Sequence, residues 1–345
     1  MSITAKKPNP MKELYRRLQA AGLPRKYVRT ALLPSWWVDE IAVNPAGYAE
    51  AVMLLSRHSG IDVRALLADK DRLRLSDTAR ARLKKSRRAA GDDLMIARGL
   101  ATQVASYAAM GADAIPLRVP TSARGLRQDI LDEGNVWVSL DNLLDACWAR
   151  GIPVVHMSAF PQGVKRMEGL AAKIRGRPVV VIAKDQKTSA WLLFILAHEL
   201  GHIALGHLGD DQVLAEADIG KAGADADAEE KAANAFAMEL LSGDPELRVV
   251  PPSRWPAAEE LARAAKRLGI EHRIDPGHVV LNYAHSMGPT FFAVANAALN
   301  QLEPAADAPQ RIRERLARRL AWSNLPREAS EFLMRMTQTD VAVAS

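Results

Sequence analysis

Residues 189–206 constrain the fold of this chain more than any other stretch of its sequence. Seven consecutive apolar residues, 191–197, lead directly into the pentapeptide H-E-L-G-H at residues 198–202. The stretch is long enough for a helix, and Ser189 is a suitable N-cap. Two histidines four residues apart lie one turn apart on the same helical face, so both imidazoles can reach a single metal ion, with Glu199 beside them. The pattern therefore predicts a buried helix that carries a metal site.

Burying two histidines and a glutamate in such a helix removes their hydration, and another interaction must offset this desolvation free energy. A zinc ion with bound water at His198 and His202 would provide it. Catalytic zinc usually has three protein ligands, so one more ligand is required. His207 is disfavoured, because a residue five positions after His202 is rotated away from the ligand face of a continuous helix.

The third ligand is expected from the next helix, over residues 229–241, which follows an acidic loop at 209–228. This helix begins with the adjacent acids Glu229 and Glu230, and Asn234 lies one turn after Glu230. A carboxylate from its first turn would complete a His-His-Glu set. Glu230 is the first choice and Glu229 the alternative.

The whole chain divides into four predicted parts. Apolar positions at three- and four-residue spacing predict a helical N-terminal region over residues 1–70. Residues 1–34 hold eight basic side chains and one acid, a composition compatible with a DNA-binding helix-turn-helix and with a solvated helical hairpin. A basic helical linker is expected over 71–115, a mixed domain over 116–300, and a C-terminal helical segment over 301–345.

Short β-branched stretches alternate with helical ones after residue 116. Strands are predicted at residues 136–139, 152–157 and 178–183, and a helix at 141–150. Together with the apolar helix that follows them, these elements predict an α+β domain.

The composition is that of a globular protein, with 48% hydrophobic and 25% charged residues. A net charge of +6 is compatible with contact to nucleic acid but does not require it. Cys147 is the only cysteine, so no intramolecular disulfide can form, and its helical neighbours predict a buried structural thiol. The sequence has no secretion signal and no uncharged stretch long enough to span a membrane, so we expect a cytoplasmic location without membrane contact.

Two motifs together resemble the ImmA/IrrE family of zinc metallopeptidases. The first is F-I-L-A-H-E-L-G-H-I-A-L-G-H at residues 194–207, and the second is E-K-A-A-N-A-F-A-M-E-L-L at residues 230–241. The family has the same first motif and a second helix of the form E-x-x-A-N-x-F-A. Where the family usually has a methionine-proline pair after this helix, the present chain has Ser-Gly-Asp-Pro at residues 242–245.

The resemblance implies that His198, His202 and Glu230 bind Zn²⁺ and that Glu199 is the catalytic base. It also implies a zincin-like domain with a small sheet, an active-site helix and a Glu helix. In such folds a strand before the active-site helix borders the cleft, so residues 179–182 are expected to offer an edge to the substrate.

The expected function is that of a cytoplasmic zinc endopeptidase. Members of the resembled family cleave helix-turn-helix repressors, so a regulatory protein of this kind is the expected substrate. Tyr283, His285 and His278 are candidates for the second donor that a tetrahedral oxyanion needs. The alternatives are a DNA-binding regulator, whose metallopeptidase domain is a sensor or interaction surface, and a general aminopeptidase.

Overall fold

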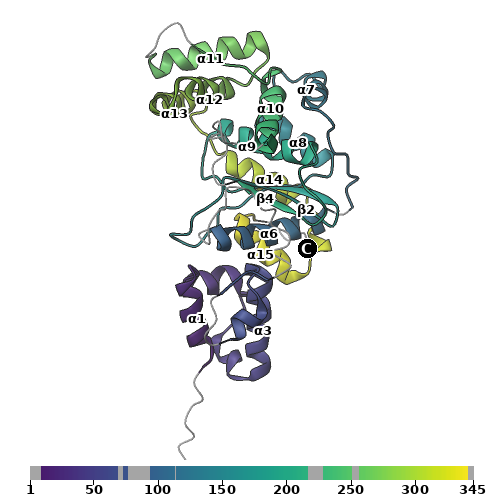
Figure 1. The fold of residues 1–345 in the computed structure, drawn as a ribbon, viewed down its shortest axis with the longest axis vertical. Coiled ribbons are helices and arrows are strands. Elements are labelled where there is room, and N and C mark those ends of the chain that lie inside the picture. Colours follow the sequence, from purple (N-terminus) through teal and green to yellow (C-terminus); the bar gives the residue numbers. More distant parts are fainter. Residues whose placement is uncertain are drawn as a thin grey trace, which may run out of the picture.

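The computed structural model describes residues 9–68, 73–76, 94–112, 114–216, 228–250 and 256–340. Part of the predicted basic linker, at 71–72, 77–93 and 113, and part of the predicted acidic loop, at 217–227, lie outside these ranges. A small sheet lies in the middle of the molecule, with helices on both of its faces (Figure 1). The chain is therefore α+β, as predicted.

The sheet has four strands in the order β1-β3-β2-β4. They are β1 (Val154–His156), β2 (Gly169–Ile174), β3 (Arg177–Ile182) and β4 (Val213–Glu216). β1 runs parallel to β3, whereas β2 is antiparallel to both β3 and β4. Because β3 has a neighbour on each side, the expectation that residues 179–182 offer a free edge to a substrate is wrong. β4 stands at the end of the sheet instead.

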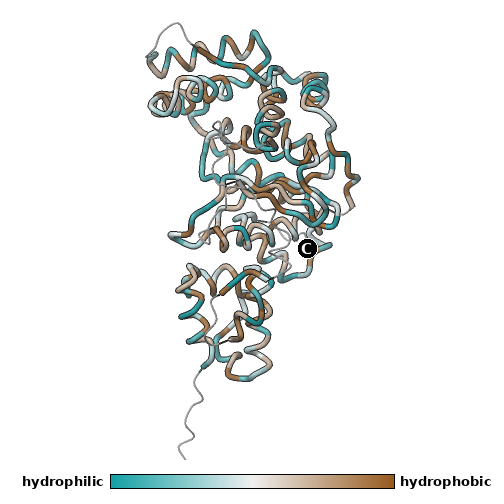
Figure 2. Tube along the Cα trace, in the orientation of Figure 1, coloured by the Kyte–Doolittle hydropathy of each residue, from teal (hydrophilic) through white to brown (hydrophobic). Residues whose placement is uncertain are grey.

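Both faces of the sheet are buried, and alternate residues of a strand pack into different cores. In β3, Val181 belongs to the core between the sheet and α6 (Met95–Gly111), and Ile182 belongs to the core between the sheet and α9 (Ser189–Ala204). Figure 2 shows hydrophobic residues along the strands between these two helical layers. Burial on both faces explains why β3 is a nearly continuous apolar run.

The layer around α9 contains α7 (Ala123–Asp132), α8 (Leu140–Ala149), α10 (Ala228–Ser242) and α14 (Ala308–Arg319). Beyond it, at the top of Figure 1, a third core joins α11 (Ala258–His272), α12 (Pro276–Met287), the 3-10 turn η4 (Pro289–Phe291) and α13 (Phe292–Leu302). The helix predicted at 141–150 is confirmed by α8, and the strands at 152–157 and 178–183 are confirmed by β1 and β3.

The N-terminal region is helical, as predicted. It contains α1 (Met11–Ala20), α2 (Arg25–Tyr27), the π-helix η1 (Val28–Leu32), the 3-10 helix η2 (Asp39–Val43), α3 (Pro45–Ser59) and α4 (Val63–Leu67). Some of its basic side chains form hydrogen bonds or ion pairs within the region. The Arg17 guanidinium donates to the backbone carbonyls of Ala65 and Leu66, and Arg25 lies 2.8 Å from the Asp39 carboxylate.

The C-terminal segment packs against the N-terminal helices on the lower side of the sheet. After the 3-10 turn η5 (Trp322–Asn324), α15 (Arg327–Thr337) packs against α6 and η1. The Phe332 ring of α15 stacks on His58 of α3 at a centroid distance of 4.3 Å. The N- and C-terminal segments therefore share one core with the lower face of the sheet.

Two local predictions are wrong because side chains bind the backbone where regular structure was expected. Residues 136–139 form no strand, since Arg273 takes the Val136 carbonyl and Ser139 caps α8. α9 has Thr188 rather than Ser189 as its N-cap residue. Ser189 lies inside the first turn, where the Glu303 carboxylate accepts from its backbone N and its Oγ, each at 2.8 Å.

Cys147 is buried, as predicted, and burial raises the pKa of its thiol to about 12. A thiol of this kind is protonated at neutral pH and is a poor nucleophile. Within the described ranges, no helix combines the length and the hydrophobicity that crossing a bilayer requires.

Candidate metal centre

α9 carries His198, Glu199 and His202 into the interior of the protein. The helix packs against β2, β3 and α10 (Figure 1). None of the three side chains is exposed to solvent. The apolar residues 191–197 account for this position, because a helix that is hydrophobic around its circumference becomes buried.

Gly201, between the two histidines, allows α10 to approach α9 closely. A Cβ atom at this position would lie 3.1 Å from the carbonyl oxygen of Ala233 and 3.2 Å from Cβ of Phe236, both on α10. Such contacts are tighter than nearly all real ones, so a larger residue would push the helices apart. The close packing brings Glu230, in the first turn of α10, to the histidine face of α9.

Three possible ligand atoms converge between the two helices. The Nε2 atoms of His198 and His202 are 3.1 Å apart. The Glu230 carboxylate lies 3.6 Å from the first and 3.5 Å from the second. In the part of the chain that the structure describes, these ligand atoms all lie within 4.8 Å of one another, and the group does not include Glu229 or His207.

The other ring nitrogen of each histidine is bound away from this point. Nδ1 of His198 is 3.0 Å from Oδ1 of Asn234, and Nδ1 of His202 is 2.9 Å from Nδ1 of His207. An amide oxygen only accepts, so His198 donates from Nδ1 and keeps the Nε2 lone pair for the convergence point. When His202 donates to His207, its Nε2 also becomes an acceptor. These contacts orient both imidazoles as metal ligands.

The electrostatics of the group favour a bound cation. Burial lowers the pKa of His198 to about 4, outweighing the hydrogen bond to Asn234, so this imidazole is neutral at pH 7. Metal binding requires both imidazoles to be neutral, and they then present, with the Glu230 carboxylate, three acceptors to the same point, whose mutual repulsion a metal ion removes. Two nitrogens and one carboxylate are also a known donor set for catalytic zinc. The residues therefore fit Zn²⁺.

Glu199 lies on the sheet side of α9, apart from the group of ligands. Its carboxylate contacts Gly169, the first residue of β2, whose neighbours in register are Ile182 and Glu216. The structure thus places Glu199 next to a ligand in the chain but between α9 and the sheet.

The three residues expected as oxyanion donors contact the N-terminal half of α9 or residues outside that helix. His278 stacks on Phe194 at a ring distance of 6.1 Å, and His285 lies 6.5 Å from Trp191. The Tyr283 side chain is buried against Phe291. Trp191 and Phe194 precede His198 by seven and four residues, so the two candidate histidines contact the part of α9 just before the ligand group.

The contact between His207 and His202 was missed by the sequence analysis. It depends on where α9 ends. The helix stops at Ala204, and Gly206 has a φ of +70°, which turns the chain so that the His207 backbone N donates to the His202 carbonyl at 3.0 Å. In a continuous helix His207 would point away from His202, whereas the turn at Gly206 brings it back to His202. Gly206 was therefore the sequence signal that could have predicted this contact.

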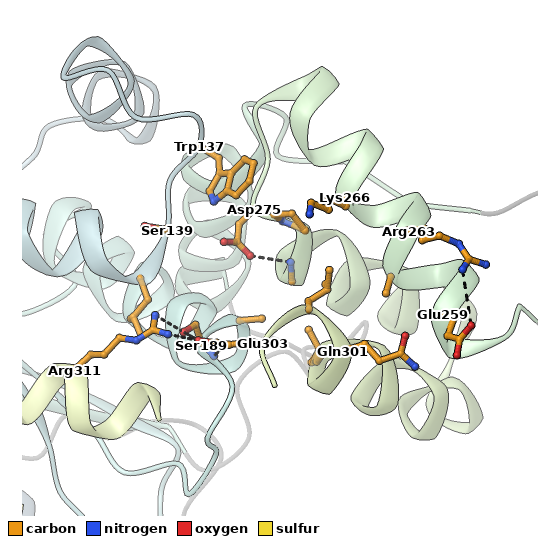
Figure 3. A pocket seen from close by; sticks show the side chains of 17 residues that line it. Trp137, Ser139, Ser189, Glu259, Arg263, Lys266, Asp275, Gln301, Glu303 and Arg311 are labelled. Atoms are coloured by element: carbon orange, nitrogen blue, oxygen red, sulfur yellow. Dashed lines mark hydrogen bonds and ion pairs between the residues drawn. The ribbon is translucent and has the colours of Figure 1, made fainter. Parts of the chain in front are cut away.

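A separate cavity of about 460 Å³ lies at the N-terminal ends of α9 and α12 (Figure 3). Glu303 lines it, bound to Ser189 and to Arg311, and Asp275 caps α12 through the backbone N of Gly277. Ser189 precedes His198 by nine residues, about 13 Å along a helix. The lining includes neither the ligand group nor Glu199, so this cavity is distinct from the metal centre.

Removing the side chain that orients His198 should weaken metal binding. We expect Asn234→Ala to lower Zn²⁺ affinity by about 10- to 100-fold, since the imidazole loses the acceptor that fixes its ring. A competition titration against a zinc chelator of known affinity measures this. The matched control is Asn296→Ala. Asn296 accepts a hydrogen bond at 3.3 Å from the ring of Trp191, which lies on α9 like His198 but away from the ligand group. Equal affinities in the two variants would contradict the orienting role.

Comparison with known families agrees with this geometry. Residues 147–272 match the family model Peptidase_M78, described as the IrrE N-terminal-like domain. The match includes all three residues of the ligand group and Glu199. No curated protein and no solved structure matches the chain.

Proposed function

We propose that the protein is a zinc-dependent endopeptidase that acts on a regulatory protein in the cytoplasm. The basis is that residues 147–272 match the IrrE N-terminal-like domain of a metallopeptidase family. The observation that carries this proposal is the convergence of His198, His202 and Glu230 within 4.8 Å, with Glu199 next in the chain to one of them. A site that only bound metal for stability would have no need for a second carboxylate, fully buried, at Glu199.

In this proposal each residue of the site has a separate role in peptide hydrolysis. His198, His202 and Glu230 hold Zn²⁺, which when bound supplies a Lewis acid that polarises the scissile carbonyl and makes water more acidic. Glu199 accepts the proton of the attacking water and passes it to the leaving amine. Asn234 and His207 keep the imidazoles in the orientation that binding needs.

The outer edge of β4 is the place we propose for the substrate backbone. β4 stands at the end of the sheet, and its pairing with β2 reaches Gly169, which the Glu199 carboxylate contacts. An extended segment added to this edge would pass close to the proposed base. Main-chain hydrogen bonds of this kind give affinity with little sequence preference. Target selection must then come from other parts of the protein.

A helix-turn-helix repressor is the substrate class that we propose, on the basis of the ImmA/IrrE resemblance. The N-terminal helices are a candidate source of selectivity, either by binding the repressor or by bringing the peptidase to DNA. Lys12, Lys26 and Arg29 are exposed on α1, α2 and η1, where they are accessible to an acidic partner.

The test is a comparison of new protein N-termini in cells that express the wild type or Glu199→Gln, at rest and under stress. We expect a few discrete cleavages in the wild type, concentrated in one regulatory protein and missing from the variant. Identical sets of N-termini under both conditions would reject the peptidase and favour the DNA-binding or sensor alternative. Turnover restricted to short peptides would instead indicate an aminopeptidase.

A further inference from the structure

Gly169 is the point at which the sheet meets the Glu199 side chain. A Cβ atom at this position would overlap Oε1 of Glu199 and lie 2.9 Å from its Cδ. It would also lie 2.9 Å from Cγ2 of Ile195, one turn earlier on α9. Real Cβ atoms essentially never make contacts below 3.0 Å. A residue with a side chain therefore does not fit at position 169 while Glu199 keeps its place.

The backbone at this position does not itself require glycine. Gly176, in the turn between β2 and β3, has a φ of +78°, which favours glycine, but Gly169 is not among the glycines with positive φ. Glycine inside a strand is unfavourable and often marks the close approach of another group. The missing side chain is accounted for by the two α9 residues that would occupy its space.

Pairing on both sides holds this part of β2 in place. Gly169 lies opposite Ile182 of β3 and opposite Glu216 of β4. Just before it, the carbonyl of Glu168 accepts from the backbone N of Ala183 at 2.9 Å. Because the strand is fixed by both neighbours, it has little freedom to retreat from α9, and a side chain at 169 would displace the Glu199 carboxylate instead.

We propose that Gly169 is a positioning residue for Glu199, with the bare backbone of β2 forming the wall that sets the carboxylate beside the metal-binding face. This inference rests on the proposed role of Glu199 as the base. It makes hydrolysis sensitive to one methyl group on a strand that supplies no metal ligand.

The first test is the kinetics of Gly169→Ala on the substrate identified by the N-terminus comparison. We expect kcat to fall about 100-fold, since a displacement of a catalytic group by about 1 Å has this effect, while KM and the zinc content stay unchanged. Gly209→Ala is the matched control, because the three atoms nearest to a Cβ there belong to the flexible Gln212 side chain, at 3.1–3.3 Å. An unchanged kcat in Gly169→Ala would overturn the positioning role, and lost zinc would assign the glycine to the metal site instead.

The second test measures the contact without using activity. Gly169→Ala should lower the Tm of the wild type by at least about 2–4 °C, as overpacking does. In the Glu199→Ala background the decrease should be smaller, with the remainder due to Ile195. Equal decreases in both backgrounds would refute the contact between Gly169 and Glu199. If the decreases differ but the wild type hydrolyses nothing, the contact stands and the proposed function is the part that fails.

Discussion

Glu199→Gln abolishes hydrolysis while the protein keeps its zinc. We expect kcat to fall by about 10²- to 10⁴-fold, the contribution of a well-placed acid-base group. Glutamine has nearly the same shape, so it fits the space beside Gly169, but its amide cannot accept the proton of the attacking water. The metal content stays at that of the wild type, because the ligand group consists of His198, His202 and Glu230.

Measured zinc per chain and kcat on the identified substrate check this prediction together. The matched control is Glu239→Gln, because Glu239 lies on α10 and its carboxylate pairs with Arg124 at 3.2 Å, outside the ligand group. The control should retain full activity. A Glu199→Gln variant with wild-type kcat would remove Glu199 from the mechanism, and a variant without zinc would make it a ligand.

Glu230→Ala removes the metal and, with it, the activity. Glu230 is the one carboxylate in the group of three ligands, and its loss leaves only two imidazoles to hold a dication. We expect the affinity for Zn²⁺ to fall by more than about 100-fold, beyond the effect of losing an orienting residue. Dialysis against a chelator followed by metal analysis should find zinc in the wild type and none in the variant.

The neighbouring acid provides the control for this prediction. Glu229 lies in the same first turn of α10 but outside the ligand group, so Glu229→Ala should keep the zinc and the activity. Zinc retained by Glu230→Ala and lost by Glu229→Ala would reverse the ligand assignment. Loss in both variants would mean that the whole first turn of α10 is needed to hold the metal.

The central helix and the convergence of its two histidines could be predicted from sequence because one local pattern encodes both. The apolar run 191–197 requires burial, and the spacing of His198 and His202 places both rings on one face. Glu230 followed from the need for a third ligand together with the family resemblance. The first two of these inferences depend on residues close together in the chain.

The parts that could not be predicted depend on contacts between distant residues. β2 contains one glycine and two alanines, and β4 has only four residues, one of them alanine, so neither has a strong strand signal and their pairing arises from the sheet around them. The Glu303 carboxylate, which binds Ser189 from 114 residues away, displaced the expected N-cap. The close approach of Gly169 to Glu199 likewise depends on how α9 lies over the sheet.

If His198, His202 and Glu230 hold the metal with which the proposed peptidase cleaves its substrate, cleavage must depend on that metal. To test this, the purified substrate is incubated with the zinc-bound protein, with protein stripped by a chelator, and with stripped protein given back one equivalent of Zn²⁺. We expect cleavage at the cellular site with the first and third preparations and no cleavage with the second. Equal cleavage by the stripped protein, or none by the zinc-bound protein, would contradict this expectation.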